Sequence, residues 1–234
     1  MNLMFRFGNL MFAGMITFLS INADASNYRR GDYSSGFYQL SQSPEIYICE
    51  HFLSDAECDH VRQIAAPHLA RSTVVDPKSP ADLLDYRRTS QGMWIQGNLI
   101  DPVIKGIQRR IAQVTEIPEQ NCEDVQVLRY GEGGEYQPHF DFFDVTTPGG
   151  LSHANRGGQR MATFMIYLAD TEEGGETIFP RANLKVRPEK GKAVLFFNVD
   201  PNGKEDPMTF HGGAPVLKGE KWIMTRWMRP GIFH

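Results

Sequence analysis

The sequence predicts a mainly β protein with flanking helices. Its second half holds four short runs rich in β-branched and aromatic residues, and turns that carry glycine or proline separate them. Its first half holds two helix starts with clear capping signals. The runs that predict strands are 124–130, 161–169, 192–199 and 221–228. An antiparallel sandwich closed by the upstream helices fits this order, and we expect a double-stranded β-helix (a jelly roll, cupin-like) as its core.

Length and charge limit the classes of function. With 234 residues, the chain can build one domain with a substantial core. Its 24 basic and 28 acidic residues nearly balance, giving a net charge of −4, and no basic run occurs. Nothing in the charge therefore suggests nucleic acid as a partner. The sequence does not indicate an oligomeric state.

The first residues have the layout of a secretory signal peptide. Arg6 precedes an apolar run over 10–21, and the small residues of Ala23-Asp24-Ala25 follow. We expect a signal peptide over 1–25 and a place in the secretory pathway: the endoplasmic reticulum lumen, or the periplasm or exterior of a bacterium. A membrane anchor and a buried helix of a cytoplasmic protein are the alternatives. The run is well short of the ~20 residues that span a bilayer, so no stable membrane span is expected.

The first half continues with a linker, a strand and a helix. Residues 26–42 are polar and read as a linker, and 45–49 predict a short strand. Ser54 and Glu57 then form a capping box, in which the side chain of each residue accepts a hydrogen bond from a free backbone amide of the other. We expect a helix from 55 to about 67 that buries Cys58, Val61 and Ile64.

A second helix is predicted to begin at Asp101-Pro102, an N-cap followed by proline at the first helical position. Residues 43–123 thus form a helix-containing N-terminal part, and 124–230 form the jelly-roll core. The stretch 146–158 shows no periodicity, and we expect a mobile loop beside the functional site. The three cysteines allow at most one internal disulfide: Cys49, Cys58 and Cys122. The apolar stripe of the second helix comprises Val103, Ile104, Ile107, Ile111 and Val114.

A His-x-Asp pair marks the functional site. In a strand, residues two apart point to the same face, so His139 and Asp141 would project side by side. They would supply two ligands of the two-histidine, one-carboxylate face that binds non-haem Fe(II), and His211 is the candidate third. Lys221 follows as a cation that could hold an anionic co-substrate. Each signal alone is weak, since a chance pair, a surface histidine or a solvated lysine would look the same. Their order strengthens them, because one pair opens the strand block and the other closes it.

Successive segments extend beyond these residues. They read SPEIYICEHFLSDAECDH, RRTSQGM, VQVLRYGEGGEYQPHFDFF, GGQRMATFMIYLADTEEGGETIFP, PEKGKAVLFFN and DPMTFHGGAPVLKGEKWIMTRW. In these blocks, from about Ser43 to Met228, the chain resembles the prolyl 4-hydroxylase family of 2-oxoglutarate- and Fe(II)-dependent dioxygenases, nearest to the plant and algal type. The resemblance implies a jelly-roll fold and an enzyme of this class.

Residue roles follow from the resemblance position by position. It implies that iron is bound by His139, Asp141 and His211. It implies that Lys221 and Tyr130 hold the distal carboxylate of 2-oxoglutarate. Two further residues are expected to line the co-substrate pocket: Thr163 and Tyr167.

The same comparison implies a set of substrate contacts. Tyr136, Arg160 and Trp227 match positions that hold a peptide or proline, although core packing explains Tyr136 and Trp227 equally well. Arg88 could face the substrate channel, with a surface salt bridge as its alternative. Collagen-type members carry a histidine where this chain has Arg229, so collagen-type behaviour is not assumed. An arginine there could still aid anion binding. The chain is too short for the separate peptide-binding domain of the collagen enzymes.

The implied reaction is hydroxylation of prolyl residues in peptides or proteins to 4-hydroxyproline, while 2-oxoglutarate is decarboxylated to succinate and CO2. The resemblance implies Fe(II), 2-oxoglutarate, O2 and L-ascorbate as cofactors and co-substrates. Hydroxylation of free proline or another small amino acid is an alternative, which a small closed pocket would favour. A catalytically silent metal-binding or interaction module is a second, and the complete ligand set with its lysine argues against it. No hydrolytic base points to a metal hydrolase.

Overall fold

A computed structural model describes residues 36–79 and 81–234. The expected signal peptide over 1–25 and the first part of the expected linker lie outside these residues. Within the described part of the chain, no helix is both long and apolar enough to cross a membrane.

Two antiparallel sheets form the body of the molecule. The larger sheet has eight strands in the order β1-β2-β13-β9-β16-β7-β6-β3, and the smaller has four in the order β12-β11-β14-β8. The strands of the larger sheet are β1 (Tyr38–Gln42), β2 (Glu45–Cys49), β13 (Ala193–Phe197), β9 (Ala162–Tyr167), β16 (Lys221–Met228), β7 (Val125–Tyr130), β6 (Gln91–Ile95) and β3 (Ala70–Arg71). Those of the smaller sheet are β12 (Leu184–Val186), β11 (Thr177–Phe179), β14 (His211–Gly213) and β8 (Tyr136–His139). Two short pairs complete the strands: β10 (Glu173–Gly174) with β15 (Val216–Lys218), and β4 (Thr73–Val75) with β5 (Asp82–Leu84).

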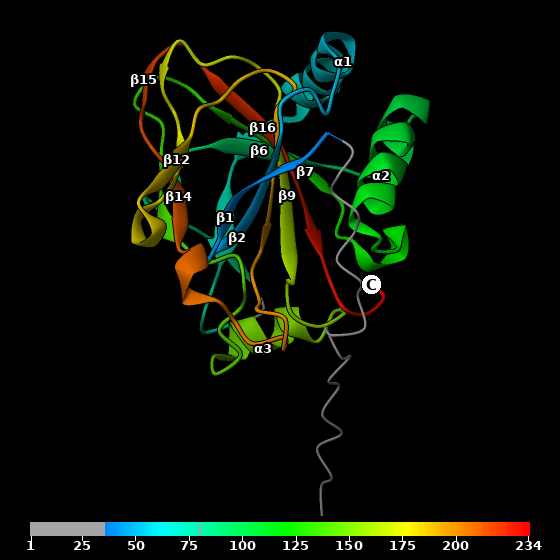
Figure 1. Ribbon diagram of the computed structural model, residues 1–234, viewed down its shortest axis with the longest axis vertical. Helices are drawn as coiled ribbons and strands as arrows, with labels where there is room; N and C mark the ends of the chain where they lie inside the picture. Colours follow the sequence, from blue (N-terminus) through cyan, green and yellow to red (C-terminus); the bar gives the residue numbers. More distant parts are fainter. Residues whose placement is uncertain (1–35, 80) are drawn as a thin grey trace, which may run out of the picture.

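The predicted fold is confirmed, and each of the four strand runs contains an observed strand: β7, β9, β13 and β16. The two predicted helices, α1 (Asp55–Ala65) and α2 (Pro102–Thr115), lie on one face of the larger sheet. The smaller sheet lies on the other face (Figure 1). The larger sheet also takes β1, β2, β3 and β6 from residues before 124, so both parts of the chain build it.

Strand β9 shows how the sheet separates two cores. Its alternate residues point to opposite faces, as the pleat requires. Phe164 and Ile166 pack in the cluster beneath the helices. Met165 and Tyr167 pack in the cluster between the sheets. All six residues of β9 are buried, because both faces of this central strand are covered.

The predicted helices are present with their predicted caps. Helix α1 (Asp55–Ala65) begins at the capping box of Ser54 and Glu57, and a 3-10 turn over 66–68 follows it. Helix α2 (Pro102–Thr115) is preceded by its N-cap Asp101, whose side chain accepts from the amide of Ile104. Of the eight core positions predicted on these helices, five are fully buried: Cys58, Val61, Ile104, Ile107 and Ile111. The other three are partly buried and pack against the same core: Ile64, Val103 and Val114.

Two sequence-based expectations are wrong. The end of the expected linker is strand β1, which pairs with β2 at the sheet edge and extends the polar segment into the fold. The expected loop over 146–158 contains helix α3 (Pro148–Ala154). Thr147 accepts from the amide of Gly150 and Pro148 takes the first turn, the same cap-plus-proline signal that marks α2. Seven residues are too short for an apolar stripe to reveal the helix.

Helix α3 packs against the β4–β5 hairpin through a glycine. The amide of Gly149 donates to the carbonyl of Pro77 at 3.2 Å. A Cβ at Gly149 would lie 1.9 Å from the carbonyl oxygen of Asp76, so only glycine permits this approach. The hairpin and α3 therefore meet closely, and both contribute walls to the cavity described below.

Candidate metal centre and active-site cavity

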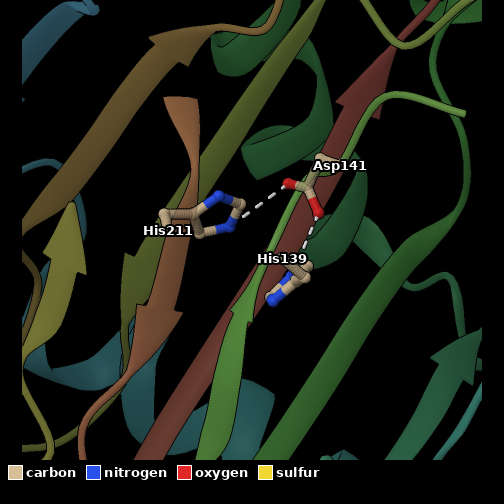
Figure 2. Close-up of side chains that lie close together, drawn as sticks. All are labelled: His139, Asp141 and His211. Atoms are coloured by element: carbon tan, nitrogen blue, oxygen red, sulfur yellow. Dashed lines mark ion pairs between the residues drawn. The ribbon is translucent and has the colours of Figure 1, made fainter. Parts of the chain in front are cut away.

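Three ligand-type side chains meet where β8 and β14 pair. His139 ends β8, His211 begins β14, and the two are direct register partners. The Nε2 atoms of His139 and His211 lie 3.5 and 3.7 Å from the two carboxylate oxygens of Asp141. Figure 2 shows the three side chains converging, and one ligand atom from each lies within 4.8 Å of the others. The structure thus brings the predicted triad together.

Asp141 does not lie on the same strand as His139, contrary to the expectation from strand alternation. Strand β8 ends at His139, and Asp141 lies two residues beyond its end. The chain bends there, and the carboxylate still comes beside the imidazole. The alternation of a strand therefore accounts for the position of His139, and the bend after it for that of Asp141.

Backbone carbonyls orient both histidines in the same way. Nδ1 of His139 lies 3.0 Å from the carbonyl oxygen of Gln137, and Nδ1 of His211 lies 2.9 Å from that of Thr209. A carbonyl only accepts, so Nδ1 carries the proton in each ring. Nε2 then presents its lone pair toward the centre of the triad, as a metal ligand must.

The carboxylate of Asp141 is held by two donors on β9 and β16. Its Oδ2 accepts from the hydroxyl of Thr163 at 2.7 Å and from the indole N–H of Trp227 at 2.9 Å. The amide of Asn198 in turn donates to the Thr163 hydroxyl at 3.0 Å. Thr163 and Trp227 were expected to contact co-substrate and substrate. Both line the cavity, and both also fix a metal ligand.

The charge states of the triad suit a divalent cation. Burial alone would raise the pKa of Asp141, but His211, His139 and Arg160 outweigh it and hold that pKa well below its usual range. Burial lowers the pKa of His211 to about 4, so its imidazole is neutral near pH 7. An ionised carboxylate and a neutral imidazole are the forms that ligate Fe(II). The residues present therefore fit the metal.

Lys221 lines one end of the cavity. It begins β16 opposite Tyr130 of β7, as the cross-strand register sets. Its side chain is 3% exposed, and within residues 36–79 and 81–234 no carboxylate forms an ion pair with it. Burial lowers its pKa to about 7. A buried ammonium without a counter-ion fits the carboxylate of 2-oxoglutarate, which would supply the missing charge.

Two tyrosines surround this lysine, but only one faces the cavity. The Nζ atom of Lys221 lies 5.7 Å from the ring centre of Tyr130 and 5.8 Å from that of Tyr167. Tyr130 lines the cavity, whereas Tyr167 is absent from the described lining residues. The Tyr167 hydroxyl donates to Thr177 at 2.7 Å and is fully buried, so this ring supports the wall from behind.

A buried cluster of two arginines and one glutamate forms the opposite end. Arg160 grips both carboxylate oxygens of Glu123 at 2.6 and 2.8 Å, and Nε of Arg229 donates to one of them at 2.7 Å. Burial would raise the pKa of Glu123, but the two cations outweigh it and lower it. The guanidinium of Arg160 also lies 3.8 Å from the ring centre of Trp227, the residue that holds Asp141.

Arg229 lines the cavity and bonds other parts of its wall. It is 1% exposed, and besides Glu123 its Nη1 donates to the carbonyls of His153 and Gly158, at the end of α3 and just beyond it. Burial lowers its pKa to about 10, at which it remains a cation near pH 7. Its hydrogen bonds tie α3 to the sheet, so the contacts of Arg229 in the structure are with the protein itself.

Tyr136 and Arg88 form a further wall beside the triad. The ring of Tyr136 stacks on His139 with 3.6 Å between centroids, and the guanidinium of Arg88 lies 5.0 Å from the Tyr136 ring centre. Arg88 is buried and donates to the carbonyl of Thr73 and the side chain of Gln126. These contacts leave no place for the surface salt bridge considered as its alternative.

One cavity of about 560 Å³ joins these parts. Its lining runs from Lys221 past the triad to Arg160 and Arg229, and it includes residues of α3 and of the β4–β5 hairpin. A metal, an anionic co-substrate and a further molecule can therefore meet in one space.

Two residues that hold this site were not predicted from the sequence: Glu123 and Asn198. Glu123 lies two residues before β7, where an acidic residue ahead of an apolar run looks like part of an ordinary solvated turn. Asn198 follows β13 in the same unremarkable way, although it is fully buried. The one usable signal was a polar residue placed directly after the apolar run 193–197, and it is a weak one.

A jelly-roll core with a two-histidine, one-carboxylate centre and a buried lysine in the same cavity defines the class of 2-oxoglutarate- and Fe(II)-dependent oxygenases. The family model of the 2OG-Fe(II) oxygenase superfamily matches residues 125–229.

Similar proteins narrow this class. Prolyl 4-hydroxylase 1 of Arabidopsis thaliana is 42% identical over 204 residues, which cover 81% of this chain and 70% of that protein. Probable prolyl 4-hydroxylase 4 of the same plant is 38% identical over 216 residues, covering 83% and 70%. Among solved structures, the viral collagen prolyl hydroxylase of Paramecium Bursaria Chlorella virus-1, crystallised in complex with 2-oxoglutarate, is 34% identical in sequence. The match covers 78% of this chain and 94% of the viral chain, with a TM-score of 0.58. The chain belongs to the prolyl 4-hydroxylase family, and the resemblance seen in its sequence is confirmed.

Proposed function

We propose that the protein hydroxylates prolyl residues of peptides or proteins to 4-hydroxyproline, with decarboxylation of 2-oxoglutarate to succinate and CO2. The observation that carries this proposal is the single cavity that joins the triad, the unpaired Lys221 and the Arg160–Trp227 wall. The names of the similar proteins support the prolyl substrate.

The residues of the cavity would have three different roles. His139, Asp141 and His211 would hold Fe(II), which when bound supplies the oxidising chemistry with O2. Lys221 would pair with a carboxylate of 2-oxoglutarate and fix its orientation. Thr163 and Trp227 keep the Asp141 carboxylate in place by hydrogen bonds to Oδ2.

The opposite wall would place the substrate. Tyr136, Arg88, Arg160 and Trp227 present aromatic faces and cations to the cavity, suited to a proline ring and to peptide carbonyls. Positioning a C–H bond close to the reacting centre and keeping water away are the protein's main contributions to the rate.

A polypeptide substrate fits the cavity better than free proline does. A volume of about 560 Å³ lies within the range of roughly 300–1,000 Å³ that takes drug-sized ligands, far more than one small amino acid fills. Free proline remains the second candidate, and the assay below separates the two.

The test is succinate formation from 2-oxoglutarate by the iron-loaded protein with ascorbate present. A proline-rich peptide and free proline are supplied in separate reactions, and product mass is followed. Peptide-dependent turnover with a mass gain of one oxygen supports the proposal. Turnover with free proline alone would replace it with small-molecule metabolism, and no turnover with either would remove the prolyl assignment.

A further inference from the structure

Three phenylalanine rings gather beside the metal centre. Phe140 and Phe142 stack with 4.5 Å between ring centres, and Phe210 lies 5.0 Å from Phe140. Each is the direct chain neighbour of a predicted metal ligand: Phe140 separates His139 from Asp141, Phe142 follows Asp141, and Phe210 precedes His211. The three rings form one group, here called the phenylalanine platform.

The platform belongs to neither core. All three rings are partly exposed, and none joins the two buried clusters on the faces of the larger sheet. Keeping three large apolar side chains partly in water gives up part of their burial free energy. Phe140 and Phe142 also line the cavity, so the platform is continuous with the active site. A role in contact with a ligand explains this placement better than core packing does.

A single arginine covers the platform. The guanidinium of Arg181 lies 5.2 Å from the ring centre of Phe140 and 4.9 Å from that of Phe210. The side chain is exposed, and its one hydrogen bond to described residues is from Nη1 to the carbonyl of Pro207. Among the described residues no carboxylate pairs with it, in contrast to Arg87, Arg110 and Arg129. Its remaining N–H groups are free to bond a ligand.

We propose that the platform and Arg181 bind the part of a proline-rich polypeptide that flanks the residue in the active site. This inference rests on the proposed function and names the surface that recognises its substrate. A proline-rich segment is already a polyproline II helix, which makes no internal hydrogen bonds and docks on aromatic surfaces. Its rings would pack on Phe140 and Phe142, and its unpaired carbonyls would accept from Arg181.

Binding of a fluorescein-labelled decaproline tests the proposal, measured by fluorescence anisotropy with the iron-loaded protein and 2-oxoglutarate in the absence of oxygen. A labelled Gly-Ser peptide of equal length is the comparison probe. The variant is Arg181→Gln, an exposed position where a change does not threaten the fold. Lys185→Gln is the matched control, because it removes an exposed cation from the same region, outside the cavity lining.

We expect Arg181→Gln to raise the Kd for decaproline about two- to twelvefold, the factor that matches the loss of one hydrogen bond to the peptide. Lys185→Gln should leave it unchanged. Phe142→Ala, with its iron content checked, should raise the Kd further, since a ring surface is lost. Equal Kd values for the wild type and both platform variants would overturn the proposal, as would equal binding of the Gly-Ser peptide by the wild type.

Turnover distinguishes failure of this inference from failure of the proposed function. If the wild type hydroxylates proline-rich peptides but Arg181→Gln and Phe142→Ala bind decaproline as the wild type does, the platform is not a docking surface and the enzyme assignment stands. If decaproline binds through the platform but no proline peptide is hydroxylated, the surface stands and the prolyl reaction is lost.

Discussion

Each end of the cavity holds a buried cation, but only one of the two cations is paired within the part of the chain that the structure describes. At one end, Lys221 is 3% exposed and no described carboxylate pairs with it. At the other end, Arg229 is 1% exposed and bonds Glu123 and two backbone carbonyls. A buried charge is expensive unless it is paired. The paired Arg229 therefore stabilises the cavity wall, whereas the unpaired Lys221 can bind an anionic ligand.

The same contrast exists between two buried lysines. Lys192 pairs with Glu50 and Glu189, and these partners raise its pKa against the effect of burial. Lys221 has burial as its main influence, which lowers its pKa. Partners, and not burial alone, therefore separate a structural cation from one that awaits an anion.

The metal centre lies between the two ends, and its loss should have the largest effect. Asp141→Ala or His139→Ala removes a ligand of the triad, and we expect turnover to be abolished and iron binding to be lost. Iron stoichiometry and succinate formation measure this. Glu172→Ala, which removes an exposed acid paired only with Lys218, should change neither. Wild-type turnover in Asp141→Ala would refute the metal assignment.

Local signals in the sequence were enough for much of this architecture. The capping box at Ser54 and the Asp101-Pro102 pair gave both long helices, since each satisfies amides within one turn. The triad and Lys221 were also predicted, from their order along the chain and from the family resemblance.

Long-range partners were beyond the sequence. Glu123 meets Arg160 and Arg229 across separations of 37 and 106 residues, and no local pattern records such a pairing. Strand β1 was missed because an edge strand with polar residues lacks a buried face to pattern it. The role of Trp227 as a donor to Asp141 also depends on a contact between distant segments.

Removing the acid at the arginine end tests whether that end is structural. Glu123→Gln leaves two buried guanidinium groups without a carboxylate, and we expect a loss of about 3–5 kcal/mol in the free energy of unfolding. Denaturant titration measures it. Glu220→Gln is the matched control, because it breaks a partly exposed pair with Arg129, worth at most about 1 kcal/mol. Equal losses in the two variants would show that burial does not distinguish the pairs.

Lys221→Met tests the end that awaits a ligand. A charge-assisted contact with 2-oxoglutarate worth about 1.5–3 kcal/mol predicts a 2-oxoglutarate requirement about 10–150-fold higher. Stability should not fall near pH 7, because the change removes a buried unpaired charge. Lys192→Met should behave in the reverse manner, lowering stability while leaving the requirement unchanged. A drop in stability for Lys221→Met with an unchanged requirement would make Lys221 a structural residue.

The pKa of Lys221 adds a pH dependence. Its pKa in the fold is about 7, below the ordinary lysine value, so the ammonium form dominates below pH 7. Affinity of the free protein for 2-oxoglutarate should therefore fall as pH rises above about 7, and Lys221→Met should lack this dependence. The sign for stability is opposite: the unfolded chain holds the proton longer, so the cost of the buried charge is full below pH 7 and fades as pH rises toward the ordinary lysine value. Isothermal titration across pH 6–9 checks the first, and an affinity for 2-oxoglutarate that stays constant over this range would contradict it.

The smallest expected effect separates charge from shape at the arginine end. Arg229→Lys keeps the cation beside Glu123 but loses the planar fork that also reaches the carbonyls of His153 and Gly158. We expect a loss of about 1–2 kcal/mol in stability, from one or two hydrogen bonds, and faster amide exchange over 148–158 than elsewhere. Arg181→Lys, at an exposed arginine away from this cluster, should leave that segment unchanged. If amide exchange over 148–158 rises no more than elsewhere in the protein, Arg229 supplies only its charge. Its planar fork then has no part in holding α3.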